Sequence, residues 1–395
     1  MKLGILFLVL GYVLSQFYRS FLAVLTPVLE TDIGATAADL AFASGIWFLV
    51  FAIMQIPVGW ALDRFGPRLT ASLMLGVGGG GGGIIFATAT SPGSIAIAMG
   101  LFGVAGAPVL MAAYYIFTRI YPQALFATLG GAMMGIGTSG NLAGSAPLAY
   151  AVELWGWREV MWGLTAAALL IAIAVFMILR DPEKEASETQ QSGNLFTILT
   201  NRNLLLIFPL MMVNYVPAAG LRGLWAGPYF KDIFGLDAQG IGQATLMMAT
   251  AMALGAFSYG PMERLIGSKK WVILGGNLAG AALCLLLWAF PETTWLTSAI
   301  IFTAIGFFGA SFPAMMAHGQ LFLPKHLTGR GITMLNLFAI GGVALMQFVT
   351  SAMAKSVSLE YAATADFYSG LFLLFGLSLF AGCVIYAFSS EEPSS

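Results

Sequence analysis

The chain has 395 residues and a formal net charge of −1 at pH 7, and its composition is 59% hydrophobic but only 9% charged. Average soluble domains carry about 25% charged residues, and no soluble fold hides so much apolar surface. The composition therefore excludes an ordinary soluble protein, and the balanced charge gives no sign of a nucleic-acid partner.

Apolar runs of about 20 residues follow one another along the chain, and each has the length that a helix needs to cross about 30 Å of hydrocarbon. The sequence thus predicts an all-α membrane protein. No small-residue cleavage site with a polar region follows the first run, so we expect a permanent span there and not a signal peptide. The twelve expected spans are 3–27, 40–61, 69–89, 94–117, 128–151, 160–179, 203–229, 240–260, 271–290, 296–317, 330–353 and 366–388.

The most polar stretch of the chain lies between the sixth and seventh expected spans and extends from Arg180 to Arg202. We interpret residues 181–202 as a cytoplasmic linker. It divides the chain into an N-terminal six-helix bundle over 1–180 and a C-terminal six-helix bundle over 203–395.

Basic residues are distributed unevenly between the two sides of the membrane. If the N-terminus is inside, only Arg158, Lys231 and Lys355 fall in outer loops. Because the cytoplasmic side carries the excess of lysine and arginine, we expect a multi-pass protein of the inner membrane with both termini in the cytoplasm. The twelve basic residues on that side are Lys2, Arg64, Arg68, Arg119, Arg180, Lys184, Arg202, Arg264, Lys269, Lys270, Lys325 and Arg330.

An internal repeat appears at an offset near 200 residues. The loop after the second span contains Asp63-Arg64, and the loop after the eighth contains Glu263-Arg264; in both loops a glycine and a basic residue follow. Duplication of a six-helix unit is common in transporter folds.

The first of these loops matches a known family signature. Gly59, Asp63, Arg64, Gly66 and Arg68 agree position by position with the motif that follows the second helix in the major facilitator superfamily. The chain resembles this family over its whole length, through its helix number, linker and repeat. The resemblance implies twelve helices in two pseudo-symmetric bundles, alternating access around a central cavity, and a conformational latch in this loop and its repeated counterpart.

Two other motifs of the family are matched only in part. Many proton-coupled members have an arginine in the fourth helix, but Ala98–Gly103 has none. The fifth span contains Gly140–Pro147, which is loosely similar to the antiporter motif of drug exporters but lacks its Gly-Pro pair. A coupling proton or cation remains an open expectation.

Two arginines lie inside spans. Arg19 in the first span and Arg222 in the seventh are 203 positions apart, so they occupy equivalent places in the two halves. An ionised group at the bilayer centre costs at least ~2.5 kcal/mol and usually faces a cavity or a partner. Guanidinium groups suit carboxylates and phosphates, and no acidic residue lies clearly mid-span, so we predict an anion site. Snorkelling and pairing with a protein carboxylate are the alternatives.

The resemblance supports the pairing of these arginines, because helices one and seven face each other across the cavity in this superfamily. Paired arginines there resemble those of organophosphate and related anion transporters. Around Arg222, the stretch Leu221–Tyr229 contains glycine and proline that permit a helix break, and aromatic groups that could stack on an organic ligand. Further candidates for substrate binding, for which interhelical hydrogen bonding is the alternative, are Tyr18, Gln55, Tyr114, Tyr115, Asn141, Asn214, Tyr215, Trp225, Asn336 and Gln347.

Other chemistry finds little support. His318, His326 and Glu153 could exchange protons, although structural roles are favoured for the histidines. The run Gly78–Gly83 lies inside a span, so it predicts close helix packing and not nucleotide binding. Cys284 and Cys383 are expected to be buried thiols. Since no Walker A sequence, metal-ligand cluster or catalytic motif is found, we expect no enzyme, no cofactor and no metal.

The favoured function is secondary active transport of a small organic anion by a monomeric transporter. One alternative is transport of a neutral or amphipathic nutrient such as a vitamin, with the arginines serving gating. A membrane-embedded sensor or assembly subunit with a transporter-like body is the alternative from a different class.

Overall fold

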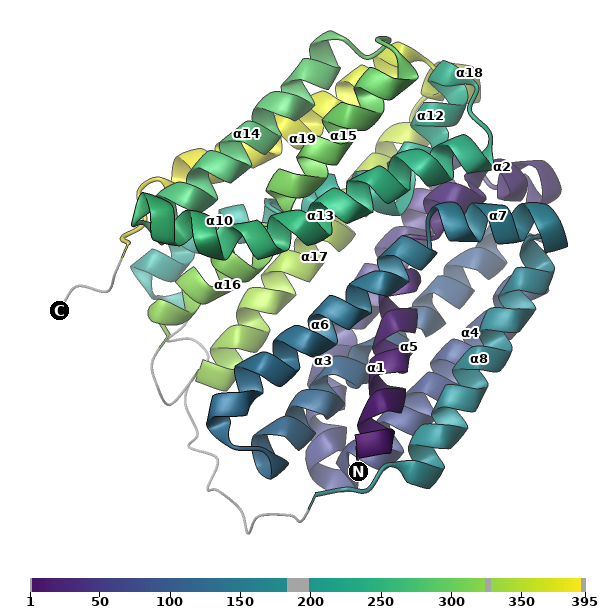
Figure 1. Cartoon of the computed structure of the whole chain (residues 1–395). Helices are drawn as coiled ribbons and strands as arrows, with labels where there is room; N and C mark the ends of the chain where they lie inside the picture. Colours follow the sequence, from purple (N-terminus) through teal and green to yellow (C-terminus); the bar gives the residue numbers. More distant parts are fainter. Residues whose placement is uncertain (1, 183–198, 324–327, 392–395) are drawn as a thin grey trace. The chain divides into compact units, whose positions relative to one another are not determined.

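The computed structural model describes residues 2–182, 199–323 and 328–391 of the chain. All regular structure in these residues is helical (Figure 1). By internal contacts the chain divides into two compact units, which are described separately. Unit one comprises Met1–Ala186, Gly223–Pro228 and Leu236–Gln243, and unit two comprises Ser187–Arg222, Tyr229–Gly235 and Ala244–Ser395.

The helices of the first half follow the predicted apolar runs, with breaks inside several of them. They are α1 Lys2–Phe17, α2 Leu22–Ile33, α3 Ala37–Met74, the π-helix η1 Leu75–Gly81, α4 Gly82–Ala87, α5 Pro92–Ile120, α6 Gln123–Ala143, α7 Ala146–Trp155 and α8 Trp157–Ile178.

The second half is built in the same way, and its seventh span is divided into four pieces. Its helices are α10 Arg202–Val213, α11 Val216–Gly220, the π-helix η2 Leu221–Trp225, α12 Ala226–Phe234, α13 Ala238–Ile266, α14 Lys269–Ala289, α15 Trp295–Gly309, α16 Phe312–Leu321, α17 Thr328–Lys355, α18 Leu359–Ala362 and α19 Ala365–Tyr386.

The number of membrane-crossing helices is consistent with the twelve predicted spans. Among the described residues, nine helices are long and apolar enough to cross a membrane, and the bent pair α1 and α2 makes a tenth. The predicted second and third spans are joined in one 51-residue segment, Ala37–Ala87, which is interrupted at Gly66, where the backbone is not helical. The predicted fifth span coincides with α6 and α7.

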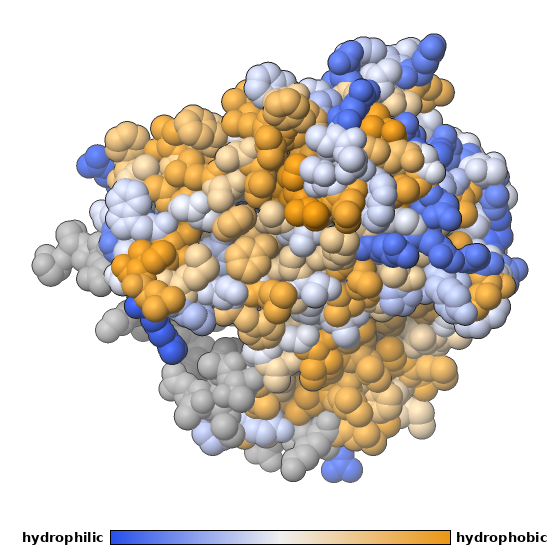
Figure 2. All heavy atoms as spheres, turned by 45° about the horizontal axis from the view of Figure 1, so that its top comes forward, coloured by the Kyte–Doolittle hydropathy of each residue, from blue (hydrophilic) through white to orange (hydrophobic). Residues whose placement is uncertain are grey.

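Large apolar side chains are exposed on helices of both units. Ile56 is 73% exposed, Met177 74% and Phe257 72%. Figure 2 shows wide hydrophobic areas on the visible face. Exposed apolar area of this extent is unfavourable in water but contacts lipid in a bilayer. The surface therefore agrees with a membrane protein.

The glycine-rich run in the third span is an interhelical contact. A methyl group added at Gly78 would lie 2.5 Å from the carbonyl oxygen of Leu101 and 2.6 Å from the nitrogen of Ala105, both in α5. At Gly79 it would lie 3.1 Å from the methyl group of Ala168 in α8. The predicted role in close helix packing is confirmed.

The predicted buried thiols are also confirmed. Cys284 in α14 and Cys383 in α19 are both free and buried. Cys383 belongs to the hydrophobic core of unit two, where it packs with residues such as Leu210 and Leu379. Neither thiol is available to reagents in the surrounding solution, which is useful for labelling experiments.

Close packing of α17 on α10 depends on Gly342. An added methyl group there would lie 1.9 Å from the carbonyl oxygen of Met212, whereas at the neighbouring Gly341 it would meet nothing within 4 Å. Because backbone atoms cannot rotate away, Gly342→Ala should separate the helices and destabilise the protein by ~1–3 kcal/mol. We expect a lower thermal unfolding midpoint in detergent for Gly342→Ala and a near-normal one for Gly341→Ala. Equal midpoints for the two variants would contradict this account of the packing.

Candidate functional site

The first span is broken at Arg19. The helix α1 ends at Phe17 and α2 begins at Leu22, and the direction of the chain bends by 57° between the two helices. In the turn between them, the Arg19 backbone nitrogen donates to the carbonyl oxygen of Gln16 at 3.3 Å. The arginine that the sequence places inside the membrane is thus held at an irregular point of the chain and not within a regular helix.

Aromatic rings on α3 hold the Arg19 side chain within unit one. Its guanidinium carbon lies 5.0 Å from the ring centroid of Trp47 and 4.8 Å from that of Phe51. The Nε atom is buried and makes no hydrogen bond to any residue that the structure describes. The residue as a whole is only half-buried, and among the described residues no carboxylate pairs with it. The predicted alternative of a protein carboxylate partner is therefore not seen at Arg19.

The seventh span is also irregular, as the sequence predicts. The helix α10 ends at Val213, Asn214 and Tyr215 form a turn, and Pro217 lies in the first turn of α11. Proline has no N–H group, so it removes the hydrogen bond that would join the two helices. Arg222 follows in the π-helix η2, and only 2% of its surface is exposed. π-helical turns are often found at functional sites.

The two arginines thus lie in matching contexts. Each one lies in a stretch where the regular α-helix of its span is interrupted. Interrupted spans expose backbone groups where they face protein or a cavity, and transporters build binding sites from them. Beside Arg222 the helix changes to a π-helical turn without a break, and the break in this span lies at Asn214 and Tyr215. The break at Arg19 was not predicted.

The other candidates of unit one have mixed surroundings. Tyr18 is buried and stacks on Phe102 at 3.9 Å with an interplanar angle of 5°. Gln55 is buried and its amide donates to the carbonyl oxygen of Phe51 at 3.2 Å. Tyr114 and Tyr115 are half-buried on α5, and the guanidinium carbon of Arg119 lies 3.5 Å from the ring of Tyr115. Asn141 is half-buried on α6.

In the second half of the sequence, the candidates divide between buried and half-buried positions. Trp225 is fully buried, and Gln347 is 2% exposed. Asn336 is half-buried on α17. Tyr215 is half-buried and its ring lies 6.1 Å from that of Phe312. A role in substrate binding remains a prediction for each of them.

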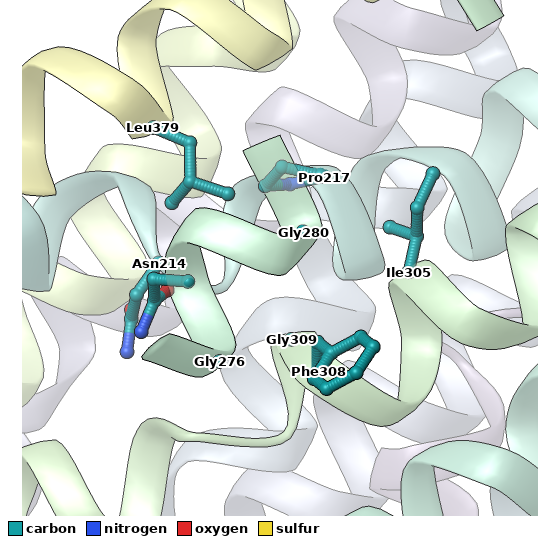
Figure 3. Close-up of a pocket in the computed structure, with 9 residues that line it drawn as sticks. Asn214, Pro217, Gly276, Gly280, Ile305, Phe308, Gly309 and Leu379 are labelled. Atoms are coloured by element: carbon teal, nitrogen blue, oxygen red, sulfur yellow. The ribbon is translucent and has the colours of Figure 1, made fainter. Parts of the chain in front are cut away.

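Asn214 faces a small cavity inside unit two (Figure 3). The cavity also contacts Pro217, Asn277, Phe308 and Leu379, and the space open to the centre of a water-sized sphere is about 10 Å³. That space has room for about one water molecule and none for an organic anion. Asn214 is fully buried, and within the described part of the chain its side-chain amide makes no hydrogen bond.

Asn277, which is not among the predicted binding residues, lies on the wall of the same cavity. Its amide donates to the carbonyl oxygen of Ile273 at 2.8 Å and to the hydroxyl of Ser311 at 3.1 Å. Ser311 lies in the break between α15 and α16, so this asparagine joins the ninth span to an interruption in the tenth. The sequence feature that could have indicated this residue is a polar asparagine inside the apolar run 271–290.

Tyr229, at the end of the aromatic stretch after Arg222, packs inside unit two. Its ring stacks on Phe302 at 5.4 Å with an interplanar angle of 13°, and its hydroxyl donates to the carbonyl oxygen of Pro291 at 2.7 Å. A side chain used in this way supports the end of the span.

The structural interpretation of His318 is also supported. The ring is buried, Nδ1 accepts from the Tyr386 hydroxyl at 2.8 Å, and Nε2 donates to the carbonyl oxygen of Ser390 at 3.1 Å. His326 lies outside the described residues. Glu153 is exposed at the end of α7. Within the described part of the chain, no three potential metal ligands come together.

The signature loop of unit one turns at a glycine with an unusual backbone. Gly66 has φ +84° and ψ +166°, inside the segment α3. A methyl group there would lie 2.6 Å from the carboxylate of Asp181. That carboxylate accepts from the Arg68 backbone nitrogen at 2.8 Å, and the Arg68 Nε donates to the carbonyl oxygen of Phe176 at 2.6 Å. The loop is thus tied to the end of the sixth span.

The charged residues of this loop are open to the surroundings. Asp63 and Arg64 are exposed, and the guanidinium carbon of Arg64 lies 5.6 Å from the Trp60 ring. Within unit one, the carboxylate that accepts from the backbone after the Gly66 turn is that of Asp181 and not that of Asp63. The role of this loop as a conformational latch stays a prediction.

The corresponding loop of unit two repeats the turn. Gly267 has φ +75°, which agrees with its alignment to Gly66. Glu263 pairs with Lys269 at 3.5 Å, and Arg264 is exposed. Both loops thus place a glycine with positive φ three or four residues after the acid, which supports the predicted duplication.

Comparison with known proteins gives a family match that repeats along the chain. The profile described as Major Facilitator Superfamily matches residues 8–223 and again 204–395. A putative tartrate transporter of Agrobacterium vitis is 22% identical, with 98% of this chain and 90% of that protein covered. A probable L-galactonate transporter of Escherichia coli strain K12 is 23% identical, with 99% and 89% covered. The crystal structure of a D-xylose-proton symporter has a TM-score of 0.77 at 15% identity, with 98% and 97% covered.

Proposed function

Because the chain belongs to the Major Facilitator Superfamily, and the relatives named above are transporters and not enzymes, we propose that it moves a small carboxylate across the inner membrane. In this proposal two six-helix bundles, over 1–180 and 203–395, alternate access around a central site and are joined by the linker 181–202. The working unit is a single chain.

The proposed substrate class depends on the surroundings of Arg19. It is an ionised side chain at a break in a membrane span, and no carboxylate among the described residues neutralises it. A group of this kind is costly in a membrane unless something binds it. A substrate carboxylate supplies the missing charge, and Arg222 stands at the equivalent position of the second repeat.

The relatives support the same class of substrate. Tartrate and galactonate, the compounds named for two of them, are both hydroxylated carboxylates. At 22% and 23% identity the relatives do not fix which acid this chain takes. The D-xylose-proton symporter supports a coupling proton in a shared fold, so we include coupling to a proton or another cation.

A binding screen with matched pairs of compounds tests the proposal. Each pair has an acid and its neutral counterpart, such as tartrate with threitol and galactonate with galactose. Ligands that bind only the folded protein raise its thermal midpoint by mass action. Acids should raise the midpoint of the purified protein, and the neutral compounds should not. Stabilisation by the neutral members alone would favour the neutral-nutrient alternative.

The proposed orientation places both termini in the cytoplasm. Leu265 in the repeated loop and Leu359 in α18 are 86% and 71% exposed, and the two native thiols are buried. In intact cells, a membrane-impermeant maleimide should label Leu359→Cys and not Leu265→Cys, because only the former faces outward. Both should react after the membrane is permeabilised. The reverse pattern would invert the proposed orientation.

A further inference from the structure

We propose that Trp47 and Phe51 form an aromatic shelf that positions Arg19 for the substrate carboxylate. This inference rests on the proposed function, because it assigns a role in the same site. Neither ring was singled out by the sequence, in which they read as two ordinary aromatic residues of an apolar span.

The aromatic shelf is a rigid pair on one face of α3. Trp47 and Phe51 are four residues apart, so their side chains lie one above the other. Their rings stack at 5.1 Å with an interplanar angle of 14°. Trp47 is fully buried and Phe51 is 8% exposed. The shelf is therefore fixed by packing before any ligand arrives.

Arg19 lies about equally close to both rings. Its guanidinium carbon is 5.0 Å from the Trp47 centroid and 4.8 Å from the Phe51 centroid, inside the ~6 Å within which a ring face attracts a cation. Since Arg19 lies in the turn between α1 and α2, regular helix hydrogen bonding does not restrain it. Contact with the two rings restrains the Arg19 side chain instead. It also holds the break in the first span against the second span.

The choice of rings instead of a carboxylate has a chemical consequence. A carboxylate would neutralise Arg19 and would occupy two of its five N–H donors. A ring face attracts the cation without accepting a conventional hydrogen bond, so the positive charge and the donors remain available. The buried Nε, which makes no hydrogen bond among the described residues, agrees with an arginine kept ready for an anion. The shelf therefore positions Arg19 but does not itself contact the substrate in this proposal.

Fluorinated phenylalanines at position 51 test the shelf. Fluorine withdraws charge from the ring face and changes its shape little. Using tartrate and galactonate as probes, we expect KM for uptake to rise stepwise with the number of fluorine atoms, while kcat stays near the wild-type value. Phe51→Leu should raise KM by about three- to thirty-fold, and Phe51→Tyr, which keeps a ring, should restore most of the affinity. Trp47→Leu is the second variant if Phe51→Leu is poorly produced.

Two controls separate this role from ordinary packing. Phe86 is a fully buried ring of the same unit, with no arginine over it among the described contacts, so Phe86→Leu should leave KM nearly unchanged. In an Arg19→Gln background, Phe51→Leu should cause no further loss of affinity, because the shelf has nothing left to position. An equal loss in both backgrounds would overturn the proposal.

The results for Arg19→Gln and for fluorination at position 51 also distinguish a failure of the aromatic shelf from a failure of the proposed function. If Arg19→Gln weakens binding of the acids but fluorination at position 51 has no effect, the shelf is wrong and the carboxylate proposal stands. If Arg19→Gln binds the acids normally, or if neither acid binds the wild-type protein, the proposed function fails and the shelf fails with it.

Discussion

Replacing either Arg19 or Arg222 with glutamine should weaken binding of tartrate or galactonate by roughly ten- to a hundred-fold. A hydrogen bond to a charged group contributes about 1.5–3 kcal/mol, which corresponds to that change in affinity. Lysine should restore little, since it keeps the charge but loses the planar fork. The measurement is equilibrium binding to purified protein whose yield and thermal midpoint match the wild type.

The double variant tests whether the two arginines act on one ligand. If both contact the same carboxylate compound, the second substitution finds the ligand already weakly held, and the combined loss should be smaller than the product of the single losses. A snorkelling arginine would behave differently, with altered insertion or yield but affinity within about twofold. Normal binding in both single variants would remove the main support for an anionic substrate.

Asp63→Asn should slow transport by about tenfold or more and leave equilibrium binding nearly intact. Asp63 is exposed in the signature loop, away from the aromatic shelf, and the resemblance assigns this loop to the latch of one conformation. A latch changes the balance between two states, and a shift of ~1.4 kcal/mol alters that balance tenfold. Uptake rates in liposomes, compared with binding to the purified protein, separate the two effects.

Glu263→Gln is the matched variant in the repeated loop. Glu263 pairs with Lys269 in its own loop at 3.5 Å, and both side chains reach solvent. Because an exposed ion pair contributes little, Glu263→Gln should slow transport less than Asp63→Asn does. Loss of ligand binding in Asp63→Asn at unchanged yield would refute a purely conformational role for this loop.

The sequence was sufficient to predict the helices and the repeat, because both depend on local patterns. Apolar runs of fixed length mark the spans, and the loop glycines Gly66 and Gly267 mark turns that need positive φ. Gly and Pro within Leu221–Tyr229 predicted an irregular seventh span beside Arg222. The break at Arg19 could not be predicted in this way, since neither glycine nor proline lies within Tyr18–Phe21.

The surroundings of the candidate residues could not be obtained from the sequence, because they depend on contacts between distant segments. Asp181 accepts a hydrogen bond from the Arg68 backbone, from which it is 113 positions distant in the sequence, and no pattern in either segment predicts that contact. Asn214 and Asn277 are 63 positions apart in the sequence, and only the folded chain brings them to one small cavity. The position of Arg19 over Trp47 and Phe51 likewise appears only when the second span lies beside the first.

Uptake by proteoliposomes tests the central claim most directly. Purified protein is reconstituted, and uptake of radiolabelled tartrate, galactonate, threitol and galactose is measured under a proton gradient, under a sodium gradient and in exchange with the same compound inside. We predict uptake above that of protein-free liposomes for at least one of the two acids and for neither neutral compound, with loss of that uptake in Arg19→Gln. Uptake of a neutral compound without uptake of either acid would contradict the account.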